Sequence, residues 1–165
     1  MAHKGVVAHG SSDPEELANT LYGMVRDGHI PAVLGAFKHM IREKRSDILD
    51  RLILRLVGEG QVNRAKQLLK QKADPVLAAR GWLTLIEETT DVSEENAFDL
   101  ILCVNVIHGQ EVRQDILLQL CGFIGLESRE GKTGFVTFIL QKLNRWDDRF
   151  FVHAWFYAGR SPHQA

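Results

Sequence analysis

The chain has 165 residues, of which 45% are hydrophobic and 25% are charged, and its formal net charge is −1. These proportions exclude a disordered chain, which would need low hydrophobicity and a high net charge. The near-neutral balance disfavours a protein that holds nucleic acid by bulk charge, and the length predicts a single domain.

The two ends of the chain differ from its middle in composition. Residues 1–12 predict a flexible leader without an apolar secretory segment, and residues 161–165 predict a flexible tail. The helical domain is therefore expected to span residues 13–160.

The two cysteines, Cys103 and Cys121, both stand in apolar runs. Two cysteines are too few for a disulfide framework, so we expect buried free thiols in a reducing compartment. The longest apolar stretch has five residues, at 100–104, whereas a helix that spans a bilayer needs roughly 20. We therefore expect a cytoplasmic protein with no membrane partner and leave a nuclear or organellar location open.

Capping residues and helical spacing predict five helices in the first half. Asp13-Pro14 and Asp74-Pro75 each predict a helix start, because Asp accepts from exposed N–H groups and Pro is preset for the first helical position. Ser46 or Asp47 is expected to cap a third helix. The expected ranges are 14–26, 32–42, 47–57, 61–72 and a fifth helix that starts at 75.

The second half contains longer apolar runs. Residues 98–107 suit either a buried helix or a buried strand, and the acidic turn 93–95 before them favours a helix start. Residues 116–126 and 135–143 are predicted as apolar segments separated by a polar loop, and 144–157 as a final aromatic helix. The sequence thus predicts an all-α fold, either a single-domain helical bundle or a short α-solenoid of helical hairpins, with eight or nine helices.

A weak repeat connects the second and fourth predicted helices. Gly28 and Gly60 open them and lie 32 positions apart, a spacing typical of stacked helical pairs. The segment 62–69, followed by Asp74-Pro75, resembles the second helix of a tetratricopeptide or pentatricopeptide repeat. The resemblance covers residues 15–100, although Val33 stands where a small alanine is expected. It implies a concave binding surface for a peptide or for single-stranded RNA.

Two segments resemble enzyme motifs. The loop 125–133 resembles a phosphate-binding Walker loop, but five residues separate Gly125 from Gly131 where the motif has four. A solvated connecting loop is therefore the prediction there. Residues 98–108 resemble a core strand of Rossmann-like methyltransferases, although no GxGxG motif is present. A methyltransferase fragment is our third functional interpretation.

No residue set predicts a metal or catalytic centre. Cys103 and His108 fall on different sides of a helix, and the remaining histidines are scattered without ligand spacing. No Ser/His/Asp or Cys/His constellation can be assembled from the sequence. We expect a protein that is not an enzyme and carries no cofactor.

The charge is distributed unevenly along the chain. Residues 38–72 hold ten Lys and Arg against four Asp and Glu, and residues 87–99 hold six Asp and Glu with no Lys or Arg. A basic face would suit single-stranded RNA or an acidic protein segment, so an RNA-binding helical repeat is our second functional interpretation. The residues expected to form it are Arg42, Arg45, Arg51, Arg55, Arg64 and Lys66.

Aromatic residues concentrate in the last predicted helix, where residues 146–157 hold six of the thirteen in the chain. Phe150, Phe151 and Trp155 fit an inward stripe, which leaves other aromatic side chains free for contact. Because Trp, Tyr and Arg dominate binding hot spots, our preferred interpretation is a protein-protein interaction or adaptor module that binds a protein partner or itself. The expected contact residues are Arg145, Trp146, Arg149, Trp155, Phe156 and Tyr157.

Overall fold

The computed structural model describes residues 13–124 and 129–157, apart from the side chains of 129–132, and this part of the chain is all-helical. The predicted all-α class is therefore confirmed. The leader 1–12 and the tail 161–165 lie outside the described residues. The nine helices are α2 (Pro14–Arg26), α3 (Ile30–Lys38), α4 (Arg42–Gly58), α5 (Val62–Gln71), α6 (Pro75–Thr89), α7 (Glu94–Val106), α8 (Gln110–Ile124), α9 (Arg129–Lys142) and α10 (Trp146–Tyr157).

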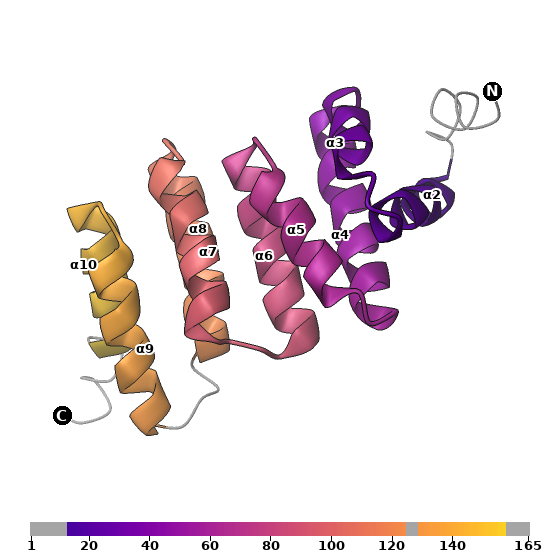
Figure 1. Cartoon of the computed structure of the whole chain (residues 1–165). Coiled ribbons are helices and arrows are strands. Elements are labelled where there is room, and N and C mark those ends of the chain that lie inside the picture. The colour runs from indigo at the N-terminus through magenta and orange to yellow at the C-terminus, as the bar shows by residue number, and fades with distance from the viewer. Residues whose placement is uncertain (1–12, 125–128, 158–165) are drawn as a thin grey trace.

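The helices stand side by side in two rows (Figure 1). The even-numbered helices pack in sequence, α2 against α4, α4 against α6, α6 against α8 and α8 against α10. The odd-numbered helices form a second row against them, with α5 beside α4 and α6, and α9 beside α7 and α10. This arrangement has the form of a short α-solenoid, in which each pair buries its apolar faces against its neighbours.

Three predicted helix starts are confirmed by their hydrogen bonds. The Asp13 carboxylate accepts from the backbone N–H of Glu15 at 3.0 Å, and the Asp74 carboxylate accepts from Val76 at 3.1 Å and from Leu77 at 3.2 Å. The Ser93 hydroxyl accepts from the N–H of Asn96 at 3.2 Å and opens α7. Short polar side chains thus satisfy the backbone donors that a first helical turn leaves unpaired.

The apolar segment 98–107 lies almost wholly within a helix, which decides between the two structures that its sequence allowed. Leu100, Ile101 and Val104 of α7 are buried at helical spacing against α6 and α8. The core strand that the methyltransferase interpretation requires does not exist at these residues. The structure therefore gives that interpretation no support.

Two predicted boundaries are also wrong. Helix α3 ends at Lys38 and α4 already begins at Arg42, four residues before the expected cap at Ser46. The Arg45 side chain explains the early break, because its Nε donates to the Met40 carbonyl at 2.8 Å and its Nη2 to the Lys38 carbonyl at 3.2 Å. These bonds satisfy carbonyl groups that the end of α3 leaves unpaired.

The predicted polar loop at 127–134 is wrong from residue 129 onwards, because α9 begins there. Glycine in a helix costs only about 1 kcal/mol relative to alanine, and α9 buries an apolar face that outweighs this cost. That face consists of Val136 and Ile139, and it continues to Leu143 just after the helix. The Walker-like segment is helical from residue 129 to 133, and its first four residues lie outside the described part.

Both cysteines are free thiols, as predicted, but the predicted burial is confirmed for Cys121 alone. Cys121 is buried and Cys103 is half-buried. Burial raises the pKa of Cys121 to about 12 and that of Cys103 to about 11, because a thiolate loses its hydration in an apolar surrounding.

Candidate binding grooves

The orientation of α10 is set by a buried ion pair with α8. Arg113 on α8 is 3% exposed, and its Nε lies 2.9 Å from Oδ2 of the fully buried Asp148 on α10. Its Nη2 reaches Asp147 at 3.2 Å, and its Nη1 donates to the carbonyls of Ile107 at 3.0 Å and His108 at 2.8 Å. Burial raises the pKa of Asp148, against the opposing effect of the Arg113 charge. This pair turns the Asp148 side of α10 towards α8.

The ion pair reverses part of the predicted burial of α10. Val152 and Phe156 follow Asp148 at intervals of four residues and are buried with it. Phe156 is only 4% exposed, so its prediction as a contact residue is wrong. Phe150, predicted to face inward, is 60% exposed. The apolar pattern was misleading because an acidic residue, Asp148, rather than an aromatic one, begins the buried side.

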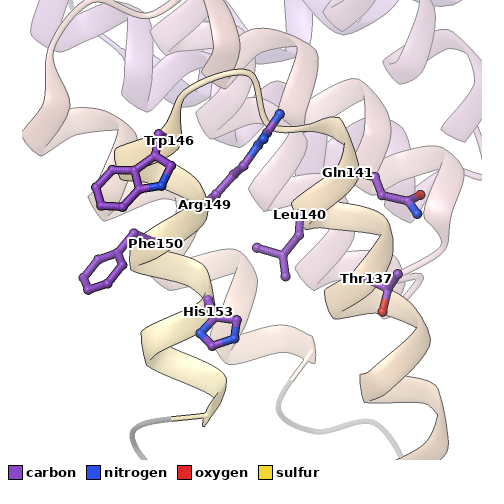
Figure 2. Close-up of a pocket in the computed structure, with 7 residues that line it drawn as sticks. All are labelled: Thr137, Leu140, Gln141, Trp146, Arg149, Phe150 and His153. Carbon is purple, nitrogen blue, oxygen red and sulfur yellow. The ribbon is translucent and has the colours of Figure 1, made fainter.

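An open groove lies between α9 and α10, with a volume of about 610 Å³ (Figure 2). On the α10 rim, the rings of Trp146 and Phe150 stack with centroids 5.3 Å apart and an interplanar angle of 20°. They are 73% and 60% exposed. Arg149, His153 and Leu140 lie between the two helices in Figure 2. Thr137 and Gln141 on α9 complete the lining, which therefore includes no acidic side chain. We name this the α9–α10 groove.

The structure brings only some of the predicted contact residues to this groove. Trp146 and Arg149 line it, and the Arg149 Nε also donates to the Leu143 carbonyl at 2.7 Å. Arg145 is half-buried, and its Nε is buried without a hydrogen-bond partner. Trp155 and Tyr157 are exposed but do not line the groove. Sequence reasoning missed the three α9 residues, because nothing in the sequence shows that the faces of α9 and α10 meet, whereas His153 belongs to the predicted aromatic helix.

The six residues of the predicted basic face stand on two helices that pack against each other. Arg42, Arg45, Arg51 and Arg55 belong to α4, whereas Arg64 and Lys66 belong to α5 in the other row.

Most of these basic side chains already have partners within the chain. Arg51 pairs with Glu15 of α2 at 2.6 Å, and Arg55 donates to Asn19 of α2 at 2.9 Å. Arg64 donates to Gln67 at 3.1 Å. Part of their charge is therefore used in contacts within the chain, and the predicted basic face stays a prediction.

The acidic segment 87–99 lies close enough to part of the basic segment 38–72 for their charges to interact. Burial raises the pKa of Asp99 on α7, while the charges of Lys70 and Lys66 on α5 act to lower it. The two segments of opposite charge thus face each other across neighbouring helices. Part of the charge polarity seen in the sequence is neutralised within the fold.

Five basic side chains from four different elements line one region of the surface. Two adjoining hollows, of about 420 and 310 Å³, share Arg45, Asp74 and Leu77 in their linings. We name the combined hollow the basic groove. Its cations are Lys38, Arg42, Arg45, Lys72 and Arg80. Lys38 on α3 belongs to the basic segment whose outer face the sequence predicts, whereas Lys72 on the turn after α5 and Arg80 on α6 were missed.

Lys72 is the residue of this groove whose pKa is clearly shifted. Its Nζ lies 4.0 Å from the centroid of the Phe37 ring, which is itself 2% exposed. Burial lowers the pKa of Lys72 to about 8, the Arg45 charge acts in the same direction, and Asp74 opposes them. The Asp74 carboxylate thus offsets only part of the effect that burial and the Arg45 charge have on the ammonium.

Other kinds of site find no support in the described residues. They hold no group of three or more His, Cys, Asp and Glu placed to bind a metal ion. Within the same ranges, no helix has the length and apolar character to cross a membrane. In comparisons with known proteins, no family model, curated protein or solved structure matches this chain.

Proposed function

We propose that this chain is a helical interaction module without catalytic activity, and that its α9–α10 groove binds a helical segment of another polypeptide chain. The observation that carries the proposal is the exposed Trp146–Phe150 stack at the groove. Large aromatic side chains lose favourable burial when they face water, and Trp and Arg are enriched among residues that dominate binding energy. Both kinds of residue line this groove.

The way in which successive helices pack on one another supports a helix as the ligand. Of the described helices, α7 and α8 are the ones that pack closely against the α9–α10 pair, and they lie on its inner side. A helix laid in the groove would therefore add one more element to the stack, as α7 does where it packs against α6 (Figure 1). Helix-in-groove recognition uses apolar anchors at intervals of three and four residues.

The charge of the lining supports an acidic helix. Arg149 and His153 contribute the titratable side chains of the groove, and no carboxylate opposes them. Acidic residues beside the apolar anchors would complement this charge and disfavour basic competitors. The proposed ligand is thus an amphipathic helix with an acidic polar face, on a protein partner or on a second copy of the chain.

The experiment compares three fluorescein-labelled, hydrocarbon-stapled helices with the same apolar stripe and an acidic, neutral or basic polar face. We expect the acidic helix to give the strongest fluorescence polarisation response. Trp146→Ala and Phe150→Ala should each weaken its binding by about tenfold or more, an effect of about 1.4 kcal/mol. The control is Leu118→Ala, which truncates an apolar side chain on α8 that is 44% exposed.

Light scattering during size-exclusion chromatography identifies the source of the ligand. Self-association that Trp146→Ala abolishes would support the proposal with a second copy as the partner. A monomer whose Trp146 and Phe150 variants bind all three helices like the unmodified chain would contradict it.

The RNA-binding interpretation has less support than this proposal, because Arg51, Arg55 and Arg64 already contact side chains within the chain. We also propose a cytoplasmic location, since both thiols remain unpaired although the chain holds two cysteines. Imaging of a tagged chain in cells tests this location directly.

A further inference from the structure

The basic groove is separate from the α9–α10 groove, and no lining residue is shared between them. Five cations line it against one acidic residue, Asp74. That carboxylate accepts two backbone N–H groups at the start of α6. Arg80 also pairs with Asp115 on α8 at 3.5 Å. After these contacts, the groove still holds an excess of positive charge.

The fold maintains this excess rather than avoiding it. Arg45 is held in place by its bonds to the carbonyls of Lys38 and Met40, and Lys72 is held over the Phe37 ring. Desolvated cations are costly unless an opposite charge pairs with them. An anionic ligand would supply that charge, so the groove has the electrostatics of an anion site.

The apolar part of the lining indicates what kind of anion fits. Leu34, Leu77, Val76 and Val112 line the two hollows between the cations. The one aromatic ring in the lining, Phe37, is buried and covered on one face by Lys72. Proteins that bind single-stranded nucleic acids use exposed aromatic rings on which the bases stack. The lining therefore favours carboxylates joined to apolar side chains over RNA.

We propose that the basic groove binds an acidic peptide segment of a protein partner, with carboxylates at the cations and an apolar side chain against Leu77 and Val112. The two hollows adjoin through Arg45 and Leu77, so the segment lies across α4 and α6 and reaches Val112 on α8. This site does not depend on the proposed function of the α9–α10 groove. One chain would thus offer two different docking surfaces.

The test measures binding of three fluorescein-labelled probes to the full chain by polarisation at low salt. The probes are a peptide of repeated Glu-Glu-Leu triplets, a matching peptide of Lys-Lys-Leu triplets, and oligouridine RNA. The acidic peptide should bind, and the other two should not. Arg42→Gln combined with Lys72→Gln should weaken binding by about tenfold or more. The matched control is Arg64→Gln with Lys66→Gln, which removes two cations outside the groove and should leave binding unchanged.

The pH dependence provides a second measurement. The charged groups that face the Lys72 ammonium are Lys38, Arg45 and Asp74. The pKa of Lys72 is lowered to about 8, and only its protonated form attracts carboxylates, so affinity should fall between pH 7 and pH 9. Lys72→Gln should lose this fall. A Trp146→Ala variant should keep the full response, which separates this test from that of the α9–α10 groove.

Three outcomes would overturn the proposal. The first is a failure of the acidic peptide to bind. The second is equal weakening by the groove variant and the control variant, which would indicate a general effect of charge. The third is binding of oligouridine in preference to the acidic peptide, which would assign the groove to RNA. Circular dichroism of each variant establishes that it is folded before binding is measured.

Discussion

Arg113 donates to two carboxylates on α10 and to two carbonyls at the end of α7, so this one guanidinium joins three elements. The Asp148 carboxylate that it contacts is fully buried, and Asp147 is partly exposed. A buried ion pair of this kind contributes little net stability over apolar residues, but the loss of one partner leaves the other charge unpaired in the core. The residue therefore acts chiefly on the geometry of α10.

Asp148→Ala is expected to lower the free energy of unfolding by about 3–5 kcal/mol, the range for breaking a buried pair by removal of one partner. Chemical denaturation at neutral pH measures this change. The control, Asp147→Ala, removes a side chain that is 39% exposed and should cost less than about 1 kcal/mol. Equal costs for the two variants would show that burial does not determine the strength of these contacts.

At the scale of the element, close packing between helices depends on one glycine. A Cβ added at Gly81 of α6 would collide with the Leu69 side chain and lie 3.1 Å from Leu49 Cδ2. This residue therefore permits α4, α5 and α6 to pack at their observed distances. Gly122 of α8 has open space around its position and no such role.

Alanine substitution at these two glycines should have opposite effects. Gly81→Ala gains helix propensity but overpacks the core, which costs about 1–3 kcal/mol, so we expect a lower melting temperature. Gly122→Ala gains up to about 1 kcal/mol of propensity without a clash and should raise it. Thermal unfolding monitored by circular dichroism measures both variants. A stabilised Gly81→Ala chain would mean that Leu69 moves aside at little cost.

Capping residues and helical spacing were sufficient to predict most of the helices. Which helices pack against each other was not predictable from the sequence. Asp13, Asp74 and Ser93 act within three residues of themselves, so their caps can be read from the sequence. Arg45 and Arg113 act on carbonyls at or just after the end of the preceding helix, and Arg113 also acts on residues more than thirty positions away. The α3 boundary and the buried side of α10 therefore escaped prediction. The basic groove was not predicted for the same reason, because its basic side chains come from elements that are separate in the sequence.

At the scale of the whole molecule, each helix pair contacts mainly its neighbours in the row. In such an arrangement, opening of one end need not disrupt the other, because stability is close to a sum of local terms. The α9–α10 groove lies at one end of the described row, beyond α7 and α8 (Figure 1).

Hydrogen exchange measured by mass spectrometry tests this view of the row. Asp148→Ala should accelerate exchange in α9 and α10, while amides of α4 and α6 keep the protection of the unmodified chain under native conditions. The control is Asp147→Ala, for which we expect little change in either region. A uniform loss of protection along the chain would indicate that the helices open as one cooperative unit.

The high pKa values of the two thiols have a practical consequence for studying the molecule. Labelling reagents such as maleimides attack the thiolate, and the pKa values of about 11 and 12 leave almost none of it at neutral pH. The chain holds no cysteine besides Cys103 and Cys121. Two cysteines introduced at exposed positions would therefore accept a donor and an acceptor dye selectively, so that distances along the row can be followed by energy transfer in the otherwise native chain.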